Sequence, residues 1–180
     1  MKEIFEQILD KDEEIIEIFK PNKRKLYTST LLLSIIAILV PVLACLLPTL
    51  ILRLNLLLLL IPIGVFIVGL TLTLVFLNIY YNNLYYAYTD KRLITRTGVF
   101  GIDYRFLVID SIGATNVYVS LIDKLVARNT GSLMFGSMSS PLINSGDGAN
   151  SGYRFNHIVA PYEMYKKIKA VIDQSKNAKL

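Results

Sequence analysis

The sequence has one cysteine, one histidine and no tryptophan. A single cysteine, Cys45, excludes an intramolecular disulfide and any zinc site built on several thiolates. The single histidine, His157, has no second histidine with which to hold a metal, and no nucleophile-elbow motif accompanies it. Strand parity predicts that His157 shares an apolar face with Tyr153, Phe155 and Val159. We therefore expect no catalytic residue, no cofactor and no metal.

Charged side chains are also scarce between residues 26 and 80, where Arg53 is the only one. As one straight helix this stretch would extend about 80 Å, far beyond the ~30 Å hydrocarbon core of a bilayer. The sequence therefore predicts a helical hairpin, with spans at 26–47 and 56–78 and a fold-back at 48–55. Helices are required because lipid offers no partner to backbone N–H and C=O groups.

A buried soluble core and a secretory signal would each account for an apolar stretch, but both fit this one less well. Globular domains rarely need two such uniformly apolar helices in succession, which disfavours a helix pair buried in a soluble protein. A secretory signal is disfavoured because the preceding 25 residues include seven acids and the apolar run is too long for a signal-peptide core.

Lysine and arginine predict the orientation, because positive charge near span ends stays on the cytoplasmic side. Basic residues are numerous before the first span and recur after the second, whereas the connection holds only Arg53. We expect a multi-pass protein of the cell's inner (cytoplasmic) membrane with both termini in the cytoplasm. Its predicted parts are a cytosolic amphipathic segment at 1–25, the hairpin at 26–80 and a cytosolic domain at 81–180.

The net charge of +5 resides in the predicted cytosolic domain. A basic domain beside an anionic leaflet is attracted to it, by about 1 kcal/mol per Lys or Arg close to the surface. Nucleic acid is the competing partner for such charge, but no Lys/Arg run or recognition motif is present. We expect membrane lipids as partners and no nucleic acid.

After residue 80 the apolar pattern changes to short alternating runs, which predicts an antiparallel meander of six or seven strands. The expected strands lie near 84–89, 92–97, 104–110, 114–120, 132–137 and 153–159, with a possible short one near Leu142. A C-terminal helix is expected from Pro161 to about Gln174, with apolar residues at helical spacing: Met164, Tyr165, Ile168, Val171 and Ile172. In the N-terminal segment, a short amphipathic helix and an extended piece are expected to pack on the cytosolic domain or a partner.

This order of elements, strands closed by a C-terminal helix, is that of a pleckstrin-homology (PH) fold. The segment 86–98, YAYTDKRLITRTG, resembles the opening motif of bacterial membrane PH-domain proteins, formerly a family of unknown function. In that family a PH domain follows a pair of transmembrane helices, and the chain ends in a run similar to residues 158–163. The resemblance implies a helical hairpin plus an α+β domain, namely a PH-like antiparallel barrel capped by a helix, and it implies no reaction. The basic spacing of phosphoinositide-binding PH domains is missing here, so phosphoinositide recognition is not expected.

The first predicted hairpin of strands suggests a membrane-surface site. If one strand leaves the membrane and turns at Asp90-Lys91, the next strand brings the segment 98–101 back towards the headgroups. The residues expected to contact the membrane surface are Lys91, Arg92, Arg96, Val99 and Phe100. The alternative is an ordinary turn in which Phe100 folds onto the barrel.

The function expected from these features is a non-catalytic binding or assembly module at the inner leaflet, with a protein partner or a second copy of the chain. One alternative is a subunit of a small oligomeric transport or export assembly. An enzyme is the third option, and it would need a partner chain or an unrecognised cluster of Asp103, Asp110 and His157.

Overall fold

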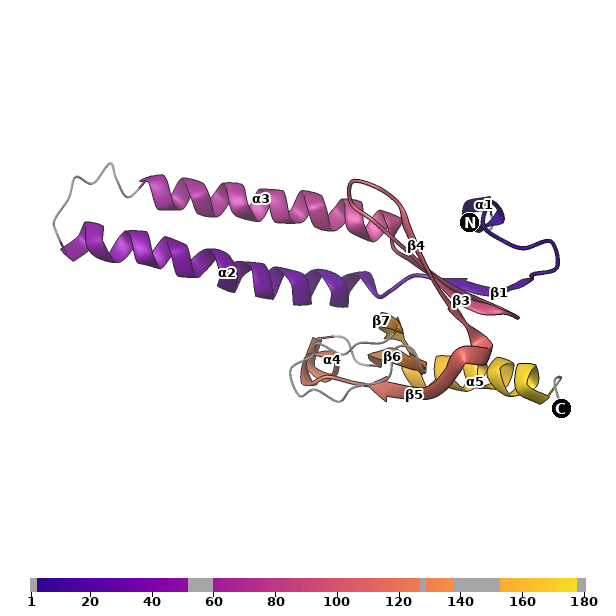
Figure 1. Ribbon diagram of the computed structural model, residues 1–180. Helices are drawn as coiled ribbons and strands as arrows, with labels where there is room; N and C mark the ends of the chain where they lie inside the picture. The colour runs from indigo at the N-terminus through magenta and orange to yellow at the C-terminus, as the bar shows by residue number, and fades with distance from the viewer. Residues whose placement is uncertain (1–2, 52–59, 127–128, 138–152, 178–180) are drawn as a thin grey trace.

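Two long helices lie side by side and the strands gather at one end of them in the computed structural model of the chain (Figure 1). The structure describes residues 3–51, 60–126, 129–137 and 153–177. The helices are α2 (Lys23–Ile51) and α3 (Leu60–Asn83), and both are long and apolar enough to cross a membrane. The two predicted helices are therefore confirmed, but α2 begins earlier and α3 ends later than the predicted spans, and 52–59 lie outside the described residues.

The surface of the two helices is exposed along most of its length. Only 6% and 11% of their apolar windows are buried. They pack closely on each other, since a Cβ added at Gly69 would lie 3.0 Å from the side chain of Ile38. The alternative of a helix pair buried in a soluble core does not describe this structure.

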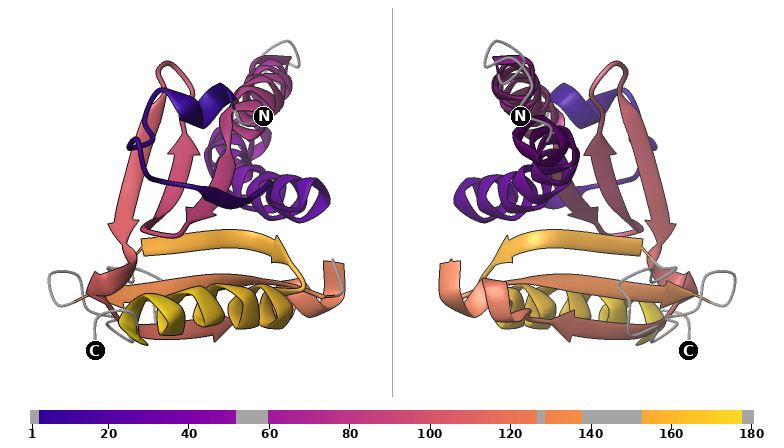
Figure 2. Two further views of the ribbon diagram at one scale, coloured as in Figure 1. Left: turned by 90° about the vertical axis from the view of Figure 1, so that its right-hand side faces the viewer. Right: turned by 90° about the vertical axis from the view of Figure 1, so that its left-hand side faces the viewer.

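The strands form two antiparallel sheets, whose strands run across each other (Figure 2). The first sheet has the order β1-β2-β3-β4, formed by Ile15–Phe19, Tyr85–Thr89, Arg92–Thr97 and Asp103–Val108. The second has the order β5-β6-β7, formed by Ile112–Tyr118, Thr130–Ser137 and Tyr153–Val159. A short 3-10 turn, η2 (Ile109–Ser111), leads from β4 to β5, and α4 (Leu121–Val126) precedes β6.

The six predicted strands are confirmed to within two residues at each end, but they do not form one closed meander. The chain leaves the first sheet at η2 and starts a second one, and both Ile109 in η2 and Ile112 at the start of β5 are buried there. The seventh strand is β1, from the N-terminal segment. The possible strand near Leu142 lies outside the described residues.

The hairpin interrupts the first sheet between two neighbouring strands. β1 precedes α2, β2 follows α3, and these strands pair with Phe19 opposite Tyr86. Only residues 20–22 separate β1 from α2, and only Leu84 separates α3 from β2. Because paired strands lie about 4.8 Å apart, both ends of the hairpin are held by the same sheet edge. The sheets are therefore fixed to the helices by short connections.

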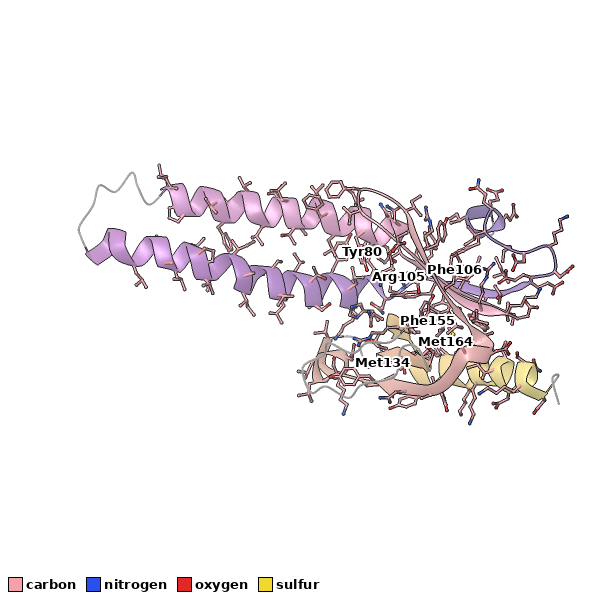
Figure 3. All side chains as sticks on the ribbon, viewed as in Figure 1. Tyr80, Arg105, Phe106, Met134, Phe155 and Met164 are labelled. Atoms are coloured by element: carbon pink, nitrogen blue, oxygen red, sulfur yellow. The ribbon has the colours of Figure 1, made fainter. Side chains whose placement is uncertain are left out.

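The main core lies between the two sheets and α5 (Pro161–Asn177). Phe155 is fully buried at its centre, with ring centroids 5.5 Å from Phe19, 4.8 Å from Tyr86 and 5.5 Å from Phe135. Phe155 of β7 and Met164 of α5, both labelled in Figure 3, belong to this buried cluster. On α5 the predicted apolar face is confirmed, since Met164, Ile168 and Ile172 are buried and Tyr165 and Val171 pack beside them.

The outer face of the first sheet is covered by the N-terminal segment. Phe5, in α1 (Glu3–Glu6), is fully buried against Ala87 and Ile94. The hydroxyl of Tyr104 donates to the carbonyl of Ile4 over 3.0 Å. The expected packing of this segment on the strand domain is thus confirmed.

Strand β7 has a bulge that changes the predicted environment of His157. Leu133 pairs with Phe155 and Gly131 with Ile158, so one extra residue lies on the β7 side. His157 takes the left-handed backbone conformation (φ 57°). The alternation that would align Val159 with Phe155 is therefore broken, and Val159 is exposed. Burial lowers the pKa of His157 below its ordinary value.

Candidate membrane-surface site

The five residues predicted to contact the membrane surface fall into two groups. Lys91 and Arg92 lie at the end of the β2–β3 hairpin that points away from the helices. Arg96, Val99 and Phe100 lie at the other end of β3 and in the β3–β4 turn, near the end of α3. Because β2 spans about 17 Å from α3 to its tip, the two groups lie at opposite ends of the β2–β3 hairpin.

Arg92 is part of an ion pair within the protein. Its Nη2 lies 2.6 Å from Oε2 of Glu13 and donates to the carbonyl of Ile8 over 2.7 Å. The Glu13 side chain is fully buried. Burial raises the pKa of Glu13, but hydrogen bonds from Arg92 and Thr89 outweigh that effect and the pKa is lowered. Arg92 therefore holds the N-terminal loop on the sheet, and its contact with the membrane surface stays a prediction.

The turn between β2 and β3 is built around Thr89. Its hydroxyl oxygen accepts the N–H groups of Lys91 and Arg92 over 3.1 and 2.9 Å, and it lies 2.7 Å from Oε1 of Glu13. Asp90 accepts the N–H of Glu14 over 3.0 Å. These residues make a tight turn and anchor the segment before β1. Lys91 is exposed at this turn.

The β3–β4 turn lies against α3. Asn83 donates to the carbonyl of Gly98 over 3.1 Å, and Gly98 has φ +151°, a conformation in which a Cβ would meet the Gly101 carbonyl. The rings of Phe100 and Phe76 are 5.7 Å apart edge to face, yet Phe100 is 93% exposed. Phe76 lies two helical turns before the end of α3. Phe100 therefore extends along the apolar helix instead of folding onto the sheets.

Val99 lines an apolar groove of about 380 Å³ beside Phe100. The other lining residues come from both long helices: Thr30, Leu72, Thr73, Phe76, Leu77 and Tyr80. Val99 is thus half-buried between the turn and the helices. The turn and the start of the apolar surface form one continuous patch.

Cations and tyrosines interleave where the sheet joins the helices. Lys20 Nζ is 4.1 Å from the ring centroid of Tyr85 and 5.0 Å from that of Tyr81. Lys23 Nζ is 5.4 Å from the ring of Tyr27 and 5.6 Å from that of Tyr81, and the Arg96 guanidinium is 5.5 Å from Tyr85. We call these six residues the collar: Lys20, Lys23, Tyr27, Tyr81, Tyr85 and Arg96. Each such contact contributes about 0.5–1 kcal/mol at an exposed site.

The collar carries positive charge that carboxylates of the described residues do not neutralise. Within the described ranges, Lys20, Lys23 and Arg96 have no ion pair, and the buried Nε of Arg96 has no hydrogen-bond partner. Cations in the first turn of a helix also oppose the helix dipole. An anionic group beside the collar would relieve both costs. Lysine and arginine on aromatic rings, at the end of an apolar helix, are suited to phosphate groups of a lipid surface.

Comparison with protein-family models, curated proteins and solved structures finds no match to this chain. Its function is therefore inferred from the geometry of the site.

The two aspartates proposed for an enzymatic cluster have separate side-chain partners. Asp103 pairs with Arg105 over 3.3 Å, and Asp110 accepts from the hydroxyl of Ser175 over 2.8 Å. His157 lies in β7, where its backbone carbonyl accepts the N–H of Asn22 over 2.7 Å. Across 3–51, 60–126, 129–137 and 153–177, no three His, Cys, Asp or Glu side chains are grouped so as to hold a metal ion.

Sequence reasoning finds only part of this site. It places Arg96 at the membrane surface, whereas Lys20 and Lys23 count only as charges that set the orientation. Their contacts depend on β1 pairing with β2, which brings Lys20 beside Tyr85. The short helix α4 was missed, although Ser120-x-x-Asp123 before apolar residues is a capping-box signal.

Proposed function

We propose that this chain is a multi-pass membrane protein whose hairpin crosses the cytoplasmic membrane and holds a PH-like module against the inner leaflet. The module acts as a non-catalytic binding and assembly element, and both termini lie in the cytoplasm. The observation that carries the proposal is the junction between sheet and hairpin. There the collar, the exposed Phe100 and the apolar helix surface adjoin one another.

Membrane insertion is supported by the exposed apolar surface of α2 and α3. Large aliphatic residues stand exposed around both helices, which is unfavourable in water at about 25 cal/mol per Å². Lipid removes that cost without any further protein. The two sheets, α1 and α5 lie at one end of the hairpin, so one insertion leaves both ends of the described chain on one side (Figure 1).

A PH-like fold is supported by the order of elements, seven strands followed by one helix that closes the core. The similarity to bacterial membrane PH-domain proteins rests on residues 86–98, whose turn residues Thr89 to Arg92 have a structural role. We infer membership of that family, with the hairpin inserted between the first and second strands.

Anionic lipid headgroups are the ligands that the collar fits best. Short connections fix the module to the hairpin and so hold the collar at the leaflet. The collar therefore needs only a weak affinity for the headgroups. The exposed side of α5, with Lys166, Lys167 and Lys169, lies away from the collar. This face is available to bind a protein partner or a second copy of the chain. This division of surfaces is the proposed basis of assembly.

The transport alternative would require a polar seam along the hairpin. The hydroxyls of Thr71 and Thr73 donate to carbonyls of their own helix, over 2.9 Å in both cases. Asn78 accepts from the hydroxyl of Tyr27 over 3.2 Å, close to the collar. These pairings favour an anchoring role for the hairpin over a conduit.

Topology is tested with the full chain in cells. In a Cys45→Ser background, Glu3→Cys and Asn177→Cys place one thiol near each terminus. An impermeant maleimide should label both thiols only after the cytoplasmic face is opened. Labelling from opposite faces, or a chain that stays in the supernatant when membranes are sedimented, contradicts the proposal.

Surface contact is tested with a photo-crosslinking residue at Phe100 or at Val108. Val108 is the matched control because it is an exposed apolar residue that pairs with Arg92 at the far end of the sheet. Lipid should be captured from Phe100 and not from Val108. One dominant protein captured from Phe100 in place of lipid would contradict the assigned surface.

A further inference from the structure

The short helix α4 exposes apolar side chains and buries an acidic one, the reverse of what is expected for a helix surrounded by water. Leu121 is 76% and Leu125 86% exposed, whereas the acidic residue between them, Asp123, is 4% exposed. Residues four apart share a helix face, so the two leucines form one exposed apolar face and the carboxylate lies opposite. A surface helix of a soluble protein would present the carboxylate and bury the leucines.

This orientation is held by specific contacts of Asp123. One carboxylate oxygen accepts the N–H of Ser120 over 2.8 Å, and Ser120 Oγ accepts the N–H of Asp123 over 3.1 Å, which forms a capping box. The other oxygen accepts from the Thr130 hydroxyl over 3.1 Å and lies 2.9 Å from Nζ of Lys25. The side chains of Lys25 and Asp123 are only 3% and 5% exposed. The helix therefore cannot rotate its leucines inward without breaking a buried ion pair.

The same ion pair fixes the position of α4 along the hairpin. Lys25 is in the first turn of α2, next to the collar residues Lys23 and Tyr27, and its N–H donates to the capping residue Asn22 over 3.0 Å. Helix α4 is thus level with the collar. It lies on the other side of the hairpin from the β3–β4 turn (Figure 1).

We propose that α4 is a second interfacial contact, in which Leu121 and Leu125 enter the interfacial layer of the leaflet that the hairpin crosses. This inference rests on the proposed membrane function. Lipid is the occupant favoured by the level of α4 and by the exposed cations around it, Lys124, Lys23 and Arg24. Contacts on both sides of the hairpin would fix the tilt of the module, so that the sheets face the leaflet in one orientation.

The absence of tryptophan from the chain allows a direct test. Single-tryptophan variants of the full chain, Leu125→Trp, Phe100→Trp and the control Val108→Trp, are placed in nanodiscs that contain phosphatidylglycerol. Quenching is measured with lipids brominated near the headgroup end of the acyl chain, and separately with aqueous acrylamide. Each substituted residue is exposed, so folding is preserved, and tyrosine near-UV circular dichroism verifies it.

Leu125→Trp should be quenched by brominated lipid several-fold more than Val108→Trp, and it should be less accessible to acrylamide. Quenching of Leu125→Trp equal to the control overturns the inference. Protection from acrylamide without lipid quenching also overturns it, because it indicates a protein in contact with α4. If Phe100→Trp is quenched and Leu125→Trp is not, only the inference on α4 fails; if neither is quenched, the proposed function fails too.

Discussion

The buried pair of Lys25 and Asp123 connects the first turn of α2 to the second sheet, and its removal gives the sharpest test of the structure. Asp123→Asn keeps the shape of the side chain but leaves the Lys25 ammonium without its counter-charge. Breaking a buried pair from one side costs about 3–5 kcal/mol. We expect the lower end, about 3 kcal/mol, because Asp123 also borders a groove of about 500 Å³.

For a chain of this size, about 3 kcal/mol corresponds to a fall of about 6–12 °C in the midpoint of thermal unfolding. The assay is thermal unfolding of the full chain in detergent, followed by the near-UV circular dichroism of its 11 tyrosines. The double variant Lys25→Met/Asp123→Asn removes both charges and should recover most of the loss. The cycle of single and double variants then reports the coupling of the two side chains.

The matched control is Lys167→Met. Lys167 pairs with Glu17 over the same 2.9 Å, but these side chains are 56% and 34% exposed. An exposed pair contributes about 0–1 kcal/mol. If Asp123→Asn shifts the midpoint no more than Lys167→Met does, or if the double variant loses the sum of the two single losses, the buried bridge is not formed as described.

Gly98→Ala should deform the β3–β4 turn, because the left-handed backbone conformation and the Gly101 carbonyl leave no room for a Cβ. The expected loss of stability is more than about 1 kcal/mol, measured as a lower midpoint of thermal unfolding. An unchanged midpoint would contradict the turn. Arg92→Met should free the N-terminal loop and speed its cleavage by added protease, whereas Lys91→Met should not; equal cleavage rates would argue against the Arg92 anchor. The stability of the fold should fall as the pH drops below 6.5, because His157 binds its proton more weakly in the folded than in the unfolded chain. His157→Asn should flatten that part of the pH profile of the unfolding midpoint. If the variant keeps the parent's slope, the pH dependence comes from other titratable groups.

The sequence by itself determined the long helices and the strands, although it missed the short helix α4. Two long apolar runs predict two helices because composition acts locally, and the alternating runs after residue 80 predict six strands because a pleated strand alternates its faces. The apolar spacing of 161–174 likewise predicted the buried face of α5. These features depend on residues a few positions apart, which a single sequence displays.

The tertiary structure decided which of these segments meet. Pairing of β1 with β2 across the inserted hairpin put Lys20 beside Tyr85 and Glu13 beside Arg92, between residues more than 60 positions apart. It thereby made Arg92 an internal anchor and created the collar. Asp123 is buried for a similar reason. Its partner Lys25 lies in the first turn of α2, so that the whole hairpin separates the two residues in the sequence. Such partners are set by packing free energy over the whole fold, and no local pattern of charge or hydrophobicity specifies them.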